Sequence, residues 1–145
     1  MIALGCDHGG LNVKNAIAAH LKNRGFETCD FGTFDTASID YPDIAKKVCA
    51  AIQNGDAEKG ILVCGTGIGM SLAANKHKGI RAAVCSEHFS ARYTRLHNDA
   101  NVLCLGERVI GAGLACELAD VFIDTEFEGG RHQTRVDKIT EIENS

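Results

Sequence analysis

One segment of the chain combines a cysteine with a glycine-rich turn: CGTGIGMS, residues 64–71. Its alternating glycines, Gly65, Gly67 and Gly69, allow several backbone N–H groups to converge on one anion at the start of a helix. The segment lacks both the Gly-Lys-Ser/Thr ending of a nucleotide P-loop and the spacing of a dinucleotide fingerprint. Met70 stands where a cysteine phosphatase loop has arginine. We interpret the segment as an anion-binding loop without a nucleotide signature, with a simple strand-to-helix turn as the alternative.

Cys64 stands at the start of this loop, where converging amides and a helix N-terminus favour the thiolate. A thiolate here could act as a nucleophile or as a general base. The neighbouring N–H groups would stabilise an oxyanion on the substrate, which suits proton abstraction beside a carbonyl as well as acyl transfer. The other cysteines of apolar segments are interpreted as small core residues: Cys29, Cys49, Cys85, Cys104 and Cys116.

A second polar segment, GCDHGG at residues 5–10, ends the first apolar run of the chain. Asp7 could handle the hydroxyl protons of a substrate and His8 could hold an anionic group. The structural alternative makes Asp7 a helix cap and His8 a surface residue. Cys6, Asp7 and His8 are not expected to bind zinc together, because consecutive side chains of a strand point to opposite faces. We predict no metal site.

Basic residues occur in two further segments. RLHNDAN places His97 and Asn98 where a helix is expected to end, so His97 either caps that helix or contacts a ligand. GGRHQTR contains Arg131 and Arg135, which are four residues apart and therefore share one helical face. Like charges on one face repel unless an anion lies between them. A solvated basic face is the alternative for this pair.

Short apolar runs alternate with helix-periodic segments along the whole chain. Strands are predicted at residues 2–6, 26–31, 60–64, 80–85 and 101–106. Helices are predicted at about 10–24, 42–54, 68–77, 87–96, 109–122 and 132–143. The alternation predicts one domain, residues 1–145, with a three-layer α/β/α sandwich fold. We expect a Rossmann-like five-stranded parallel sheet with an additional C-terminal helix.

Turn residues and the fold class indicate where a ligand would bind. Gly25 is expected to end the first helix, and Pro42 is expected in the first turn of the second. Ligands of such folds bind beyond the carboxyl ends of the strands. This rule selects the segments CDHGG, CGTGIG, SEH and GERVIG, two of which carry a thiol beside a glycine turn.

The composition argues against several classes of protein. A formal net charge of -4 at pH 7 is unfavourable for a nucleic-acid-binding protein. The longest apolar runs fall far below the roughly 18 residues of a membrane span, and the first residues do not resemble an export signal. The seven cysteines are odd in number and contain no CxxC pair, so we expect reduced thiols in the cytoplasm.

The motifs GCDHGG, Tyr41-Pro42, CGTGIGMSLAANK, RLHNDANVLCLGERVIG and GGRHQTR, in this order, resemble the ribose/galactose isomerase family over essentially the whole chain. The resemblance implies interconversion of ribose 5-phosphate and ribulose 5-phosphate through an enediolate, with no metal or nucleotide cofactor. A phosphorylated sugar is then the expected ligand. Two alternatives remain: a hexose 6-phosphate isomerase acting on allose or galactose 6-phosphate, and a non-catalytic sugar-phosphate-binding module.

The same resemblance implies roles for the residues around Cys64. Cys64 matches the general base of the family's cysteine branch, and Met70 offers no carboxylate for the branch that uses a glutamate. Thr66 and His97 match residues of ring opening, and Asp7 matches a residue that manages the sugar hydroxyls. The anion hole would be formed by backbone N–H groups of the loop: Gly65, Gly67, Ile68, Gly69, Met70 and Ser71.

The remaining matches concern the phosphate group and a second subunit. Tyr41 matches a residue that lines the pocket, and the phosphate clamp corresponds to His8, Arg131 and Arg135. In such enzymes the partner subunit supplies the residues that match His97, Asn98 and Arg108. The resemblance therefore implies a homodimer with shared active sites, and it leaves open whether two dimers pair into a tetramer.

Overall fold

Five parallel strands form one sheet in the order β2-β1-β3-β5-β4, and the computed structural model describes all of residues 1–145. The strands are β1 Ile2–Cys6, β2 Thr28–Asp30, β3 Lys59–Cys64, β4 Ala82–Val84 and β5 Val102–Gly106. The three inner strands are almost wholly buried, as expected for apolar strands in a sheet that is covered on both faces. The edge strands β2 and β4 are shorter than predicted, because each has a partner on one side only.

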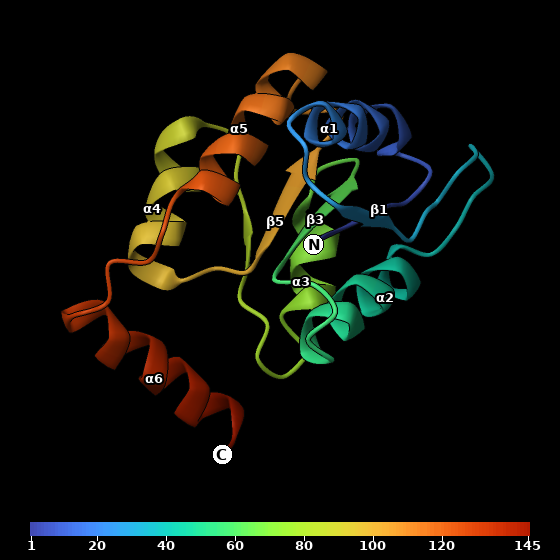
Figure 1. The fold of residues 1–145 in the computed structure, drawn as a ribbon. Helices are drawn as coiled ribbons and strands as arrows, with labels where there is room; N and C mark the ends of the chain where they lie inside the picture. The colour runs from blue at the N-terminus through green and yellow to red at the C-terminus, as the bar shows by residue number, and fades with distance from the viewer.

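The six helices are α1 Leu11–Asn23, α2 Tyr41–Gln53, α3 Ile68–Ala74, α4 His88–Asn98, α5 Ala112–Asp124 and α6 Arg131–Glu143. Helices α1, α4 and α5 cover one face of the sheet, and α2 and α3 cover the other, which confirms the predicted three-layer sandwich (Figure 1). The additional helix α6 packs mainly against α4 and extends away from the sheet. No helix has both the length and the apolar character that crossing a membrane requires.

Alternate residues of the inner strands divide the core into two parts. Ile61 and Val63 of β3 face α1 and α5, whereas Leu62 and Cys64 face α2 and α3. Cys64 thus lies at the carboxyl end of its strand with its side chain toward the α2–α3 layer, only 5% exposed. The position of this thiol follows directly from the strand's register.

The ends of the helices follow the predicted turn chemistry. Gly25 comes after α1 with a φ of 87°, a left-handed value that glycine adopts readily. Pro42 lies in the first turn of α2, where its missing N–H breaks no helical hydrogen bond. Helix α3 ends at Ala74, before the predicted residue 77. Its next residue, Asn75, exchanges two hydrogen bonds with the backbone of Ala82, which lead the chain into β4.

A buried lysine ties α1 to the segment after β2. Lys14 is 1% exposed, and its Nζ lies 2.7 Å from the carboxylate of Asp30 and 2.9 Å from the carbonyl oxygen of Thr33. The same ammonium group lies 4.7 Å from the centre of the Phe34 ring. A charge removed from water in this way requires its partners, because an unpaired charge in the interior is costly. The ion pair therefore fixes the chain that leads toward the start of α2.

Replacing Lys14→Met should lower the free energy of unfolding by about 3 kcal/mol, because it leaves the Asp30 carboxylate without its buried partner. Urea unfolding of the variant measures this change. Lys46→Met, at an exposed position of α2, provides the control and should leave the midpoint near that of the wild type. Equal midpoints for the two variants would show that the buried ion pair contributes nothing.

Candidate active site

The loops that follow β1 and β3 meet at the carboxyl edge of the sheet. The two strands are neighbours, but the chain continues from β1 to α1 on one face and from β3 to α3 on the other. Open α/β sheets bind ligands in the crevice that forms where connections diverge in this way. Glycine lets the loop after β1 approach β3 closely: a Cβ added to Gly10 would lie 2.6 Å from the carbonyl oxygen of Val63.

The loop after Cys64 folds its backbone around the sulfur atom. Gly67 has a φ of 80°, and its N–H donates a hydrogen bond to Cys64 Sγ at 3.1 Å. Thr66 Oγ1 accepts from the N–H of Ile68 at 3.2 Å, and Ser71 Oγ donates to the carbonyl oxygen of Ile68 at 2.7 Å. A hydrogen bond donated to the sulfur favours the thiolate over the thiol.

Several N–H groups of this loop have no acceptor within the chain. The groups concerned are those of Gly65, Thr66, Gly69 and Met70. Two of them belong to the first turn of α3, where a helix has no internal acceptor for its donors. Met70 is fully buried, so its side chain cannot contact a ligand. The loop therefore carries free donors beside the thiol, as an anion hole requires.

Three predicted site residues surround the loop. Asp7 is 8% exposed, and its Oδ1 accepts from the N–H of Gly9 at 2.8 Å, so it shapes the turn rather than capping α1. His8 is exposed, and its Nδ1 accepts from the N–H of Ile39 at 3.2 Å. The Tyr41 ring covers Gly69, where an added Cβ would lie 2.8 Å from Cζ of that ring. The structure thus brings Asp7, His8 and Tyr41 together with the Cys64 loop.

Arg108 also lies beside the loop of its own chain. Its N–H donates to the carbonyl oxygen of Gly65 at 3.0 Å, and its Cδ lies 3.6 Å from a Cβ placed on that glycine. The turn after β5 brings it there, because β5 pairs with β3 and ends at the same edge. Its side chain is exposed and free to reach an anion above the loop.

The other predicted residues lie at the opposite edge of the sheet. Helix α4 starts just after β4 and runs for 11 residues, about 15 Å at 1.5 Å per residue, before it reaches His97 and Asn98. The exposed Arg131 and Arg135 follow on α6, which packs against that same end of α4. One chain therefore holds two separate groups of candidate residues, which we call the loop group and the helix-end group. The loop group contains Asp7, His8, Tyr41, residues 64–71 and Arg108, and the helix-end group contains His97, Asn98, Arg131 and Arg135.

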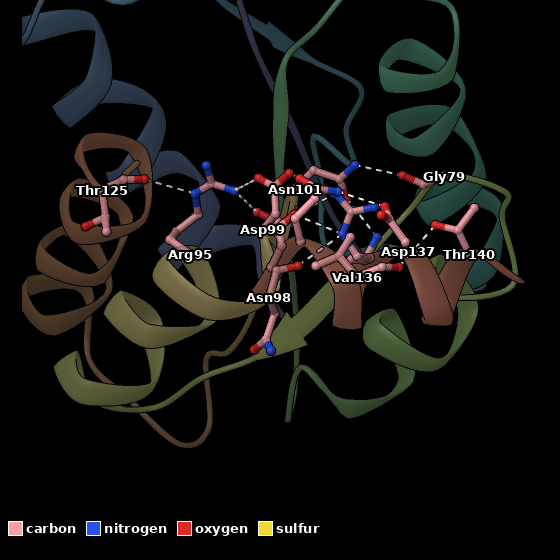
Figure 2. A network of polar contacts seen from close by, with 12 residues as sticks. Gly79, Arg95, Asn98, Asp99, Asn101, Thr125, Val136, Asp137 and Thr140 are labelled. Atoms are coloured by element: carbon pink, nitrogen blue, oxygen red, sulfur yellow. Dashed lines mark hydrogen bonds and ion pairs between the residues drawn. The ribbon is translucent and has the colours of Figure 1, made fainter. Parts of the chain in front are cut away.

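A network of charged side chains fixes the end of α4 (Figure 2). Arg95 is 6% exposed and donates to Asp99 Oδ1 at 2.9 Å and to the carbonyl oxygen of Thr125 at 3.0 Å. Arg81 donates to the carbonyl oxygens of Asn98 and Asp99, both at 3.1 Å from its Nε. These bonds satisfy carbonyl groups that a helix end leaves free. The network holds the backbone on which His97 and Asn98 are carried.

The sequence analysis missed three polar residues that the structure makes important. Lys14 lies on the apolar face of α1, and the local sequence pattern does not indicate that Asp30 is its partner. Glu107 accepts from the N–H of Val13 at 2.7 Å and so caps α1 from a distant turn. His132 is buried and stacks on His97, with ring centres 4.0 Å apart. His132 and Val136 are four residues apart and therefore share one helical face, and this spacing could have predicted the burial of His132.

The surroundings of four other cysteines favour the protonated thiol. Burial raises the pKa of Cys6, Cys49 and Cys85 to about 11 each. Burial, followed by the nearby Cys64, raises the pKa of Cys104 well above its ordinary value. All seven cysteines are free of disulfides. The environments of Cys49, Cys85 and Cys104 fit their interpretation as small core residues, because the thiolate is the reactive form.

Alkylation with iodoacetamide at about pH 8 should modify Cys64 while leaving the four raised-pKa thiols intact. The reason is the Gly67 N–H, which stabilises a negative charge on the Cys64 sulfur. Peptide mass mapping identifies the modified sites, and unfolding in urea should expose all seven thiols as a positive control. Cys64 that reacts as slowly as Cys104 in the folded protein would contradict this expectation.

The chain is an open parallel α/β protein, and its Cys64 loop lies where the connections after two neighbouring strands diverge. Proteins of this class bind small ligands at that place. Residues 2–139 match the family model described as Ribose/Galactose Isomerase. The chain belongs to the ribose/galactose isomerase family.

Relatives and solved structures of this family are similar over nearly the whole chain. Ribose-5-phosphate isomerase B of Escherichia coli is 52% identical over 98% of this chain and 95% of its own length. A structure of the Clostridium thermocellum ribose-5-phosphate isomerase B has a TM-score of 0.97 at 55% identity, covering 99% of this chain and 97% of its own. The Mycoplasma genitalium enzyme, with bound ribulose-5-phosphate, has a TM-score of 0.94 at 42% identity, covering 99% and 96%.

Proposed function

We propose that the protein interconverts D-ribose 5-phosphate and D-ribulose 5-phosphate, with Cys64 as the general base. The observation that carries this proposal is the Cys64 sulfur, which accepts the Gly67 N–H beside a row of free amides. Relatives at about half identity bear the name ribose-5-phosphate isomerase B, and a similar structure contains ribulose-5-phosphate. Seven free thiols suit the reducing cytoplasm, where we place the enzyme.

The proposed reaction moves one proton between neighbouring carbons. The Cys64 thiolate removes the proton from C2 of the open-chain aldose, a C1–C2 double bond forms, and the carbonyl electrons move to O1. The free N–H groups of Gly65, Gly69 and Met70 stabilise the resulting enediolate. Cys64 then returns the proton to C1, while O2 loses its proton as the C2 carbonyl forms and O1 gains one. The chain's own groups supply each of these steps.

Other residues would open the sugar ring and hold the phosphate. In this proposal Asp7, Thr66 and His97 transfer protons on the ring oxygen and the hydroxyls. His8 and Arg108 face the phosphate from the loop group, and Arg131 and Arg135 face it from the helix-end group. Fixing the phosphate far from C2 would use binding energy to keep the carbon within reach of the base.

Because the loop group and the helix-end group lie at opposite edges of one chain, we propose that two copies form each active site. A homodimer brings the loop of one chain to α4 and α6 of the other and yields two equal sites. Exposed apolar side chains around the loop support this arrangement. Ile68, Val84 and Val109 are 53%, 44% and 57% exposed and line a cavity of about 280 Å³ beside Thr66. A second copy would cover them.

The length of the sugar is the least constrained part of the proposal. A relative from Pectobacterium atrosepticum, 44% identical over 95% of this chain, is named D-erythrulose-4-phosphate isomerase. The names of family members therefore refer to sugar phosphates with different numbers of carbon atoms. Initial rates with four-, five- and six-carbon aldose phosphates would rank the substrates, and we expect ribose 5-phosphate to have the highest kcat/KM.

Incubation with ribose 5-phosphate in D2O should place deuterium at C1 of the ribulose 5-phosphate that accumulates, because the abstracted proton exchanges with solvent at the base. Cys64→Ala should slow this reaction by about a thousandfold, since it removes the base. Its affinity for the sugar phosphate should change little. NMR of the product measures the label, and Cys116→Ala is the matched control. Full activity of Cys64→Ala would remove the thiol from the mechanism.

Mixing two inactive variants tests whether the site is shared. Cys64→Ala and His97→Asn damage different groups, so a mixed dimer contains one intact site and one doubly damaged site. With free subunit exchange, half of the dimers are mixed and activity should recover to about a quarter of wild type. A mixture of Cys64→Ala with Cys64→Ser should recover nothing. If the first mixture also stays inactive, the two groups do not act across an interface.

A further inference from the structure

His97 and His132 form a stacked pair of imidazole rings beside a carboxylate. Their ring centres are 4.0 Å apart and the planes differ by 11°. Glu128 Oε2 lies 3.4 Å from Nε2 of His132 and 3.9 Å from Nε2 of His97. The Nε2 atom of His132 is buried and has no hydrogen-bond partner. A buried ring nitrogen without a hydrogen-bond partner is rare in proteins, and packing alone does not explain it.

The backbone is arranged to bring these three side chains together. Gly129 and Gly130 have φ values of 69° and 57°, and this bend turns the chain so that the first turn of α6 meets the last turn of α4. The N–H of Glu128 donates to the carbonyl oxygen of Leu96 at 3.1 Å, one residue before His97. The cluster is thus anchored through main-chain bonds as well as through ring stacking.

A metal ion is a poor explanation for this cluster, although its three ligand atoms lie within 4.8 Å of one another. Imidazole binds a metal through a lone pair in the plane of its ring. Two nearly parallel rings 4.0 Å apart cannot both direct such a lone pair at one ion. The stacked geometry suits one ring that holds the other in a fixed orientation.

The two rings differ in exposure and in their surroundings. Burial, followed by the nearby His97 and Arg131, lowers the pKa of His132, and Arg135 acts in the same direction against the opposite effect of Glu128. His132 therefore stays neutral near pH 7. The His97 side chain is 35% exposed, compared with 8% for His132, so His97 is the ring that a ligand can reach. The edge of the Tyr93 ring contacts its other side, with centres 5.0 Å apart.

We infer that His132 and Glu128 are positioning residues for His97: the stacked, buried ring of His132 fixes the orientation of the His97 ring, and Glu128, which lies nearer to Nε2 of His132, holds the His132 ring in place. The inference rests on the proposed role of His97 toward the substrate. His97 would then present an oriented ring nitrogen to the sugar phosphate or ring oxygen.

NMR of protein labelled with 15N-histidine tests this inference without any need for activity. In the wild type, the His97 ring signals should carry the shift that a stacked ring 4.0 Å away produces. His132→Ala should remove this shift, and His132→Phe should keep it. His20→Asn removes a surface histidine paired with Asp120 at 2.8 Å and should leave the His97 signals unchanged. Wild-type His97 signals in His132→Ala would overturn the inference.

Kinetic measurements separate positioning from simple packing. His132→Ala removes the stacked ring and should lower kcat by about tenfold with KM within about twofold, because a misplaced catalytic group costs rate rather than binding. His132→Phe keeps a flat ring and should recover most of kcat. Wild-type kcat in His132→Ala, or His132→Phe as impaired as His132→Ala, would overturn the orienting role. If the wild type proves inactive on ribose 5-phosphate, the proposed function fails and the NMR result still decides whether His132 orients His97.

Discussion

A helix that links two parallel strands has its two ends at opposite edges of the sheet. In this chain the rule separates Cys64, at the carboxyl end of β3, from His97, at the far end of α4. The separation is about 15 Å along α4 alone, so no side-chain rotation within one chain can close it. In our proposal, chemistry that needs both groups uses a second copy of the chain, which would cover the exposed apolar residues around the loop.

Two cysteines of one apolar layer have different surroundings. Cys104 lies one strand away from Cys64 in the same apolar layer, and burial raises its pKa well above the ordinary value. Cys64 lies where β3 ends, and the N–H of Gly67 donates a hydrogen bond to its sulfur. In our proposal this hydrogen bond, together with the free amides beyond it, distinguishes the base from an inert core residue.

Much of the fold could be predicted from the sequence, because the inner strands are continuous apolar runs and the helices keep their period. Gly25 and Pro42 marked helix ends by local rules that hold without tertiary contacts. The edge strands were predicted to be longer than they are, because pairing on one side shortens them and the local sequence does not indicate which strands lie at an edge. Lys14 with Asp30, Glu107 at α1 and His132 against His97 depend on partners distant in sequence. The place of Arg108 beside the Cys64 loop likewise follows from a distant pairing, that of β5 with β3.

A crystal structure of Cys64→Ala with ribose 5-phosphate would test the shared site most directly. Our account predicts that C2 of the sugar lies beside residue 64 of one chain, with its O1 and O2 on the free amides of that loop. The phosphate should lie against Arg131 and Arg135 of the other chain. A sugar phosphate bound with its C2 away from residue 64, or contacted by residues of one chain only, would contradict the account.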